Sequence, residues 1–144
     1  MKNAAVRKIN LFLLLTALFV FAGYAEAARQ NFGPFSAVVP PGWQIQIDED
    51  DGIVTFMPGD ESAGLSIIWG VMEGASLRDI AGNVSDLLDG GRPTEDEDGD
   101  FSFAFTDEDG RDCMAFITRD GRNYIIILKH GDHPQMKDLL DSLE

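Results

Sequence analysis

Hydrophobic and polar positions alternate over the first part of the chain. Trp43, Ile45 and Ile47 are separated by single polar residues, a period of two that is typical of a strand with one buried face. Similar short segments predict strands at 35–39, 53–57 and 65–71. Pro-, Gly- and Asp-rich turns separate them at 40–42, 48–52 and 58–61.

The period changes to that of a helix after Gly74. Ser76 and Asp79 have the spacing of a helix start. The apolar positions that follow recur at helical spacing, and Gly90-Gly91 and Pro93 end the pattern. The apolar stripe consists of Leu77, Ile80, Ala81, Val84, Leu87 and Leu88.

Three further strands and a second helix complete the pattern. Strands are expected at 101–105, 114–117 and 124–128, with Asp- and Gly-containing turns at 107–110 and 119–121. The last two strands are apolar on both faces and therefore central. A final helix that opens near 132–134 presents Met136, Leu139, Leu140 and Leu143 on one side.

This order of elements predicts the fold class. Short turns between successive strands require antiparallel pairing. Strands that are apolar on both faces need cover on both, so we expect one helix on each side of the sheet. The prediction is an α/β/α sandwich with a single antiparallel sheet of about six to seven strands, formed by one domain over residues 28–144.

Residues 32–144 resemble the PsbP-like superfamily. The resemblance rests on Phe35-Ser36 at a strand start, Pro41-Gly42-Trp43 at the next turn, the Ser76-Leu77 helix start and the final three-strand run. The superfamily includes the extrinsic subunit of plant photosystem II, a Ran-binding nuclear import factor and bacterial envelope proteins such as DcrB. The resemblance implies an antiparallel sheet between helices and a non-enzymatic binding or assembly role.

Residues 1–27 read as a cleaved secretory signal peptide. A basic start at residues 1–8 precedes an apolar run from Ile9 to Ala22, and Ala25 and Ala27 have the spacing that a signal peptidase recognises. The run is shorter than the ~20 residues of a membrane-spanning helix. We expect a periplasmic or secreted protein without membrane insertion after cleavage.

The charge is strongly acidic, with 25 acidic and 11 basic residues in the whole chain. Because residues 1–27 contain three of the basic and one of the acidic residues, the mature chain has a net charge of −16. This charge argues against binding to nucleic acid or to an anionic membrane. The single cysteine, Cys113, lies in an apolar run and is expected to be a small buried side chain rather than a reactive thiol.

Two groups of residues are candidate metal ligands. Asp96, Asp98 and Asp100 lie in an acidic loop that offers oxygen ligands to a cation such as Ca²⁺, although the spacing fails as an EF-hand. The alternative, which we favour, is a solvated turn. His130, Asp132 and His133 offer ligands for Zn²⁺ or Cu²⁺. Here we favour a cap of the last helix, formed by Asp132 with Gln135.

Four of the basic residues of the mature chain lie in the last hairpin and offer a patch for an acidic partner. The simpler interpretation is that they lie at strand ends and form ion pairs with neighbouring acidic residues. They are Arg111, Arg119, Arg122 and Lys129. The aromatic residues are expected in the core: Trp43, Trp69, Phe101, Phe103 and Phe105.

No motif for a nucleophile elbow or a phosphate-binding loop is found, and we expect no enzyme. The sequence therefore predicts an exported, non-catalytic accessory module that binds another envelope protein. The alternative is a cation or small-ligand binder that uses the acidic loops.

Overall fold

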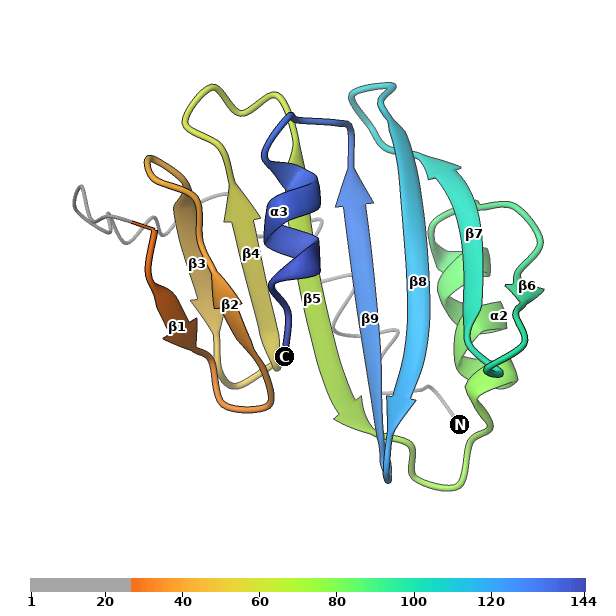
Figure 1. Ribbon diagram of the computed structural model, residues 1–144. Coiled ribbons are helices and arrows are strands. Elements are labelled where there is room, and N and C mark those ends of the chain that lie inside the picture. The colour runs from red at the N-terminus through yellow and green to blue at the C-terminus, as the bar shows by residue number, and fades with distance from the viewer. Residues whose placement is uncertain (1–26) are drawn as a thin grey trace.

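A seven-stranded antiparallel sheet dominates the computed structural model, which describes residues 27–144 (Figure 1). The predicted signal peptide lies outside the described residues except for Ala27. The strands follow the order β3-β4-β5-β9-β8-β7-β6. Their bounds are β3 Gln44–Asp48, β4 Ile53–Met57, β5 Gly64–Val71, β6 Thr94–Glu95, β7 Phe101–Thr106, β8 Asp112–Asp120 and β9 Asn123–His130.

The register aligns side chains in rows across the sheet. Directly paired residues point to the same face, so one row runs through five strands from the β3 edge to β8. Its members are Ile47, Val54, Ile67, Ile127 and Phe116. The middle of this row is covered, whereas its two ends, Ile47 and Phe116, are 52% and 38% exposed.

Helix α2 (Leu77–Leu87) covers one face of the sheet over β7 and β8. Its predicted start is confirmed: the Ser76 hydroxyl accepts from the Asp79 backbone N–H, and the Asp79 carboxylate accepts from the Ser76 N–H. Ile80, Ala81 and Val84 are buried against the sheet. The helical spacing of these residues therefore identified the buried side of the helix correctly.

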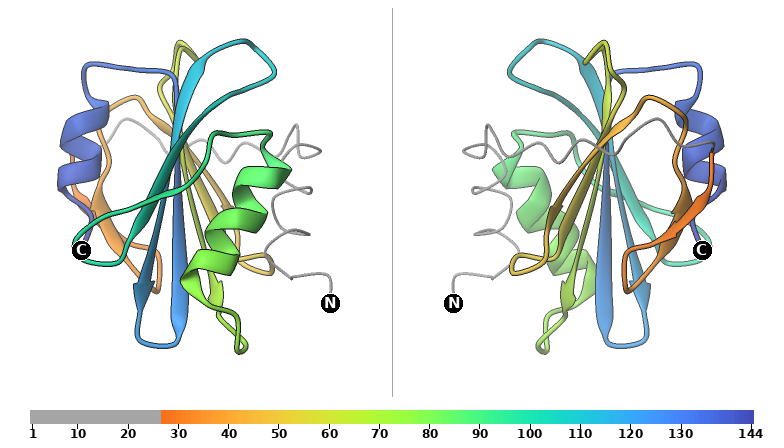
Figure 2. Two further views of the ribbon diagram at one scale, coloured as in Figure 1. Left: turned by 90° about the vertical axis from the view of Figure 1, so that its right-hand side faces the viewer. Right: turned by 90° about the vertical axis from the view of Figure 1, so that its left-hand side faces the viewer.

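Helix α3 (Met136–Asp141) and a small second sheet lie on the opposite face, as Figure 2 shows. This sheet consists of β1 (Arg29–Asn31) and β2 (Ser36–Val38). The expectation that the strand at 35–39 joins the main sheet is therefore wrong. Ser36 instead exchanges two backbone hydrogen bonds with Glu144, at 2.9 and 3.0 Å. The Pro40-Pro41 step, which lacks N–H donors, separates β2 from β3.

The predicted sandwich is only partly realised. The helices have 11 and 6 residues and lie on opposite sides of the sheet, but the α3 side is shared with β1 and β2. The main sheet has the predicted number of strands with a different membership, because β2 is absent from it and the two-residue β6 is added. Among residues 27–144, no helix has both the length and the apolar character needed to cross a membrane.

The start of α3 differs from its prediction. Gln135 is the N-cap residue and makes no side-chain cap, so the capping box of Asp132 and Gln135 is wrong. The Asp132 carboxylate accepts from the His133 N–H, and the Gln135 side chain accepts from Trp43 Nε1 at 3.1 Å. Both side chains therefore have partners other than the helix terminus.

The expectation that the aromatic residues form the core is confirmed for four of the five. Trp43 and the three phenylalanines of β7 are at most 7% exposed, and Trp69 is partly buried. The β7 phenylalanines belong to the core on the α2 side, and the two tryptophans to the core on the α3 side. The sheet is therefore packed on both faces.

Candidate functional site

The α3 side of β7 and β8 has no covering helix or strand among the described residues (Figure 1). We call four of the side chains that the register places on it the β7–β8 face: Ala104, Met114, Phe116 and Thr118. Ser102, directly opposite Phe116 on β7, points to the same side. Met114 and Thr118 are partly exposed, and Phe116 is the large apolar side chain at the centre of the face. Helix α2 covers only the other side of these strands.

An open groove of about 940 Å³ lies at one end of this face. Ala104 and Met114 belong to both the groove and the β7–β8 face, so the two are continuous. Cys113, Arg111 and Lys129 also line the groove. Apolar and charged side chains therefore meet where the β7–β8 turn reaches β9.

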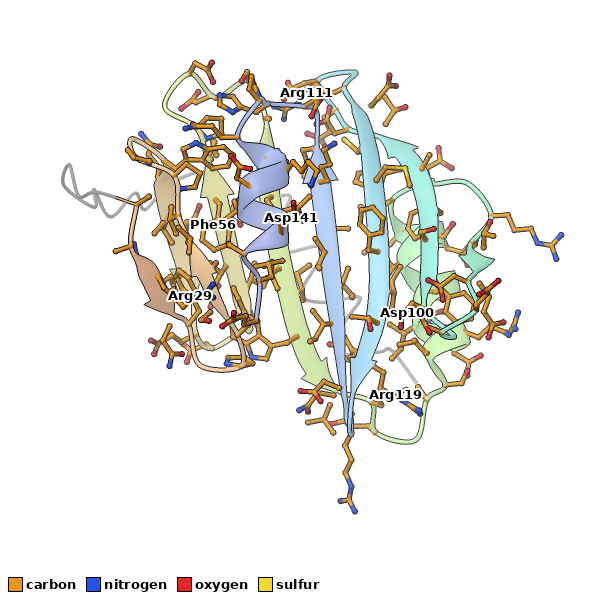
Figure 3. All side chains as sticks on the ribbon, viewed as in Figure 1. Arg29, Phe56, Asp100, Arg111, Arg119 and Asp141 are labelled. Carbon is orange, nitrogen blue, oxygen red and sulfur yellow. The ribbon has the colours of Figure 1, made fainter. Side chains whose placement is uncertain are left out.

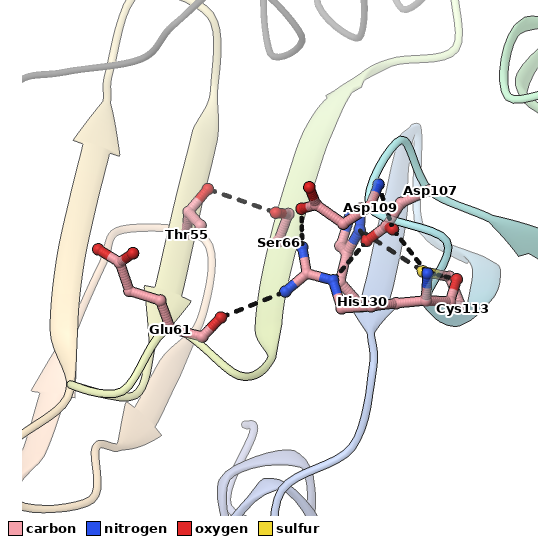
Figure 4. A network of polar contacts seen from close by, with 8 residues as sticks. Thr55, Glu61, Ser66, Asp107, Asp109, Cys113 and His130 are labelled. Carbon is pink, nitrogen blue, oxygen red and sulfur yellow. Dashed lines mark hydrogen bonds and ion pairs between the residues drawn. The ribbon is translucent and has the colours of Figure 1, made fainter.

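Asp107 organises this turn. Its side chain is 10% exposed and accepts four hydrogen bonds, which occupy both carboxylate oxygens (Figure 4). The backbone N–H groups of Asp109 and Arg111 donate to Oδ1 at 3.0 and 2.9 Å. Arg111 Nε and His130 Nδ1 donate to Oδ2 at 2.8 and 3.3 Å. Because a carboxylate only accepts, the hydrogen of the neutral His130 ring resides on Nδ1.

These contacts set the protonation states. Burial alone would raise the pKa of Asp107, but the hydrogen bonds from Arg111 and His130 outweigh it and lower the pKa to about 2. Burial lowers the pKa of His130 below its ordinary value in spite of the nearby Asp107 carboxylate. Burial also raises the pKa of the Cys113 thiol, and the Asp107 charge adds to this effect. At neutral pH the group therefore consists of a carboxylate, a neutral imidazole and a thiol.

Cys113, His130 and Asp107 do not form a nucleophilic triad. In such a triad one imidazole nitrogen faces the nucleophile while the other is held by the orienting carboxylate. Here a single nitrogen, His130 Nδ1, lies 3.6 Å from Cys113 Sγ and 3.3 Å from Asp107 Oδ2. Cys113 is only 4% exposed and donates to the Arg111 carbonyl oxygen. This arrangement does not activate the thiol.

The same three residues are a candidate metal-binding group. Asp107, Cys113 and His130 each offer one ligand atom, and these atoms lie within 4.8 Å of one another. Within residues 27–144, no other group of three His, Cys, Asp or Glu residues meets this condition. Two of the three residues, Asp107 and Cys113, are not among the ligands expected from the sequence.

The acidic loop lies elsewhere, in the turn between β6 and β7. Asp96 Oδ1 accepts from the backbone N–H groups of Asp98 and Asp100 at 2.9 and 3.0 Å. Asp98 and Asp100 also line a smaller groove of about 350 Å³ together with Arg78 and Arg119. The Asp96 side chain thus stabilises a turn, and two arginines share the groove with the other two carboxylates.

The structure separates the three residues expected around the last turn. His130 joins Asp107 and Cys113, whereas Asp132 forms an ion pair with Lys129 at 3.3 Å. His133 packs edge-on against Trp43, with ring centroids 5.3 Å apart. His130, Asp132 and His133 therefore do not converge on one point.

The four cations of the last hairpin do not form one patch. Arg111 and Lys129 lie at the groove end of the sheet, whereas Arg119 and Arg122 lie at the β8–β9 turn, at the opposite end (Figure 3). Arg111 pairs with Asp107 and Asp109. The expected partner-binding residues thus belong to two separate surfaces.

The association of Cys113 with His130 escaped the sequence analysis, although a signal for it is present. The turn at Gly121-Arg122 fixes the β8–β9 register, and counting back along both strands places Cys113 opposite His130. The β7–β8 turn likewise places Phe105 opposite Cys113. Pairing the strands around their turns, rather than searching for ligands close in sequence, would have found the contact.

A long antiparallel sheet with short helices on its two sides defines a PsbP-like fold. The solution structure of cyanobacterial PsbP (CyanoP) from Synechocystis sp. PCC 6803 matches it with a TM-score of 0.57 at 16% sequence identity, covering 87% of this chain and 96% of that chain. A crystal structure from Bacteroides thetaiotaomicron VPI-5482 matches with a TM-score of 0.48 at 16% identity, covering 76% and 44%. No protein-family model matches the sequence, and no curated protein sequence matches it. The comparison thus defines the fold.

Proposed function

We propose that the protein is an exported, non-catalytic accessory module that binds another envelope protein through the β7–β8 face. The observation that carries this proposal is Phe116, which is 38% exposed in the middle of a nine-residue strand. An aromatic side chain at such a position supplies a large apolar contact, and aromatic residues are enriched at the centres of protein interfaces. The PsbP-like fold supports an accessory role by analogy.

The surroundings of Phe116 suit a protein partner. Met114, on the same face, is an adaptable apolar side chain that accommodates partners of different shape. Ala104 and Thr118 add little bulk, so a partner can lie close to the strands. Because the mature chain has a net charge of −16, we expect the partner to present an apolar patch with a basic rim.

Export to the periplasm rests on the N-terminal sequence, with its basic start, apolar run and Ala25-x-Ala27 site. Intact-mass measurement of the protein recovered from the envelope tests this part of the proposal. We expect a chain that begins at Ala28. Recovery of the uncleaved chain of 15.8 kDa from the cytoplasm would contradict export.

Size-exclusion chromatography of gently extracted envelope fractions tests the binding surface. We expect the wild-type protein to elute with a larger assembly and the Phe116→Glu variant to elute as a monomer, because a carboxylate cannot be buried against an apolar patch without a large free-energy cost. Phe116→Ser, which adds no charge, should weaken the assembly in the same direction.

Ile47→Glu is the matched control. Ile47 is an exposed apolar residue in the same row as Phe116, four strands away at roughly 19 Å. This variant should elute with the assembly, as the wild type does. A wild-type protein that elutes only as a monomer would contradict partner binding, and a Phe116→Glu variant that stays in the assembly would contradict the assigned face.

A further inference from the structure

Asp107, Cys113 and His130 are held together by the ends of three strands. Cys113 and His130 are direct cross-strand partners on β8 and β9, and Asp107 follows the last residue of β7. Phe105 packs edge-on against the His130 ring at 5.5 Å and limits its rotation. The three side chains therefore meet on a rigid part of the sheet.

Two of the three distances between their ligand atoms match those of ligands around one tetrahedral ion. Zinc bonds of about 2.3 Å to sulfur and about 2.0–2.1 Å to nitrogen or oxygen require ligand atoms about 3.5–3.6 Å apart for sulfur and nitrogen, and about 3.3–3.4 Å for nitrogen and oxygen. The observed distances are 3.6 Å from Cys113 Sγ to His130 Nδ1 and 3.3 Å from His130 Nδ1 to Asp107 Oδ2.

The distance from His130 Nδ1 to Asp107 Oδ2 is long for a direct hydrogen bond. An N–H group that donates to a carboxylate in a strong hydrogen bond lies about 2.7–2.9 Å from it. The bond from Arg111 Nε to Asp107, at 2.8 Å, is of this kind, whereas the bond from His130 is half an ångström longer. The His130 ring therefore lies close to Asp107 without a strong hydrogen bond to it, and the ligand atoms of all three residues lie within 4.8 Å of one another.

We propose that Asp107, Cys113 and His130 form a binding site for a zinc-class transition metal ion. Binding releases the thiol proton of Cys113 to solvent and moves the hydrogen of the neutral His130 ring from Nδ1 to Nε2, so that Nδ1 can bind the ion. The thiolate and the carboxylate then balance the charge of a divalent ion, and a soft thiolate with an imidazole selects zinc-like ions over Ca²⁺. Metal binding at this site does not require the proposed partner-binding function.

The residues around the three ligands support the site. The backbone N–H groups of Asp109 and Arg111 hold Asp107 Oδ1, which leaves Oδ2 directed toward His130. Arg111 Nε donates to Oδ2 as an outer-sphere partner, a common feature of ligating carboxylates. Cys113 and Arg111 line the groove, which provides an entry path and room for water as a fourth ligand.

Titration of the reduced, EDTA-treated protein with Co²⁺ tests the proposal. We expect saturation at one equivalent, visible bands of a tetrahedral ion and a near-ultraviolet charge-transfer band that requires a thiolate ligand. Zn²⁺ should remove these bands by displacement, and excess Ca²⁺ should not. Saturating Co²⁺ without a thiolate band would overturn the proposal, whatever the variants do.

Two variants and a matched control test two of the ligands. Cys113→Ser should abolish the charge-transfer band, and His130→Gln should weaken Co²⁺ binding by at least about 100-fold, since outer-sphere partners alone account for about 10- to 100-fold. His133→Gln is the matched control, because His133 packs on Trp43 and should bind Co²⁺ as the wild type does. Equal affinity in His130→Gln and wild type would overturn the assignment.

Discussion

Asp107 accepts four hydrogen bonds, and its donors come both from its own turn and from β9. Two are backbone N–H groups of Asp109 and Arg111, and two are the side chains of Arg111 and His130. Loss of the carboxylate would leave several partly buried donors without an acceptor. The free energy of unfolding should then decrease by more than the net contribution of one hydrogen bond. The end of the β7–β8 hairpin therefore depends on this residue.

The metal-free protein should lose stability in acid through two of these groups. The folded pKa of Asp107 is about 2 against an ordinary value of 3.8, so its contribution is present above about pH 4 and is lost as the pH falls toward 2. The pKa of His130 is also lowered in the folded protein. The unfolded state therefore binds a proton more readily, and the free energy of unfolding begins to decrease as the pH drops below 6.5, the ordinary pKa of histidine. Urea unfolding at several pH values in EDTA measures both.

The Asp107→Asn variant measures the contribution of the Asp107 carboxylate to the free energy of unfolding. The amide group turns a donor toward Arg111 or His130, so we expect a loss of about 2 kcal/mol at neutral pH. The difference in unfolding free energy between wild type and variant should shrink between pH 4 and pH 2. A difference that stays constant over this range would contradict the assignment of the lowered pKa to this network.

For single residues, the sequence predicted which side chains are buried better than it predicted which side chains contact one another. The apolar run around Cys113 predicted a buried side chain, and the residue is 4% exposed. Its polar neighbours were not predicted, because His130 lies 17 residues away on β9 and Asp107 lies across the β7–β8 turn, directly after β7. Such contacts depend on strand register, which a search for nearby ligands in the sequence does not use.

Among the elements, α2 was predicted most fully because all its signals are local. The capping residues and the apolar stripe lie between Ser76 and Leu88. The expected stop at Gly90-Gly91 differs, because the residue with a positive φ after the helix is Asp89. The start of α3 and the position of β2 were missed for the opposite reason. The Gln135 side chain binds Trp43, and β2 pairs with Glu144 at the far end of the chain.

Two glycines, one in a helix and one in a strand, should respond in opposite ways to replacement by alanine. Gly82 lies within α2, and a Cβ atom there meets nothing within 4 Å. Gly82→Ala should therefore raise the unfolding free energy by about 0.5–1 kcal/mol, because glycine disfavours helix interiors. Thermal unfolding followed by far-ultraviolet circular dichroism gives the comparison.

Gly70→Ala is the contrasting variant on β5. A Cβ atom at Gly70 would collide with the Tyr124 ring and hydroxyl on β9, which is a buried side chain. Overpacking of this kind typically costs about 1–3 kcal/mol. Equal stability of Gly70→Ala and the wild type would contradict the close contact of Gly70 with Tyr124, and a loss in Gly82→Ala would contradict the open space around Gly82.

Over the whole molecule, acidic charge greatly exceeds basic charge. The chain has 25 acidic and 11 basic residues, and the ion pairs other than those at Asp107 are largely exposed. Exposed ion pairs contribute little, typically 0–1 kcal/mol each. Repulsion among the remaining carboxylates therefore opposes folding more than these pairs favour it.

Salt should accordingly stabilise the protein at neutral pH. Raising NaCl from about 0.01 M to about 0.15 M shortens the Debye length from about 30 Å to about 8 Å and screens this repulsion. We expect a higher melting temperature, with the same increase in KCl, because the effect depends on ionic strength alone. A melting temperature that falls or stays constant would mean that favourable ion pairs outweigh the repulsion.

The arrangement of the layers decides which surface is available to a partner. Helix α2 covers β7 and β8 on one side, while α3 and the β1–β2 sheet pack over β3, β4 and β5 on the other side and leave Phe116 partly exposed (Figure 1). The sequence predicted helices on both sides, but not that each covers only part of its face. The length of each helix and the place where it packs on the sheet depend on tertiary contacts. The exposed β7–β8 face could therefore not be predicted from local sequence patterns.

Photo-cross-linking in the cells that produce the protein tests the proposed binding surface most directly. A photoreactive amino acid replaces Phe116 in one strain and Ile47 in another, at the two exposed ends of one row. We predict a discrete adduct of defined mass from position 116 and none from position 47. Adducts from position 47 alone, or none from position 116, would contradict the assignment of partner binding to the β7–β8 face.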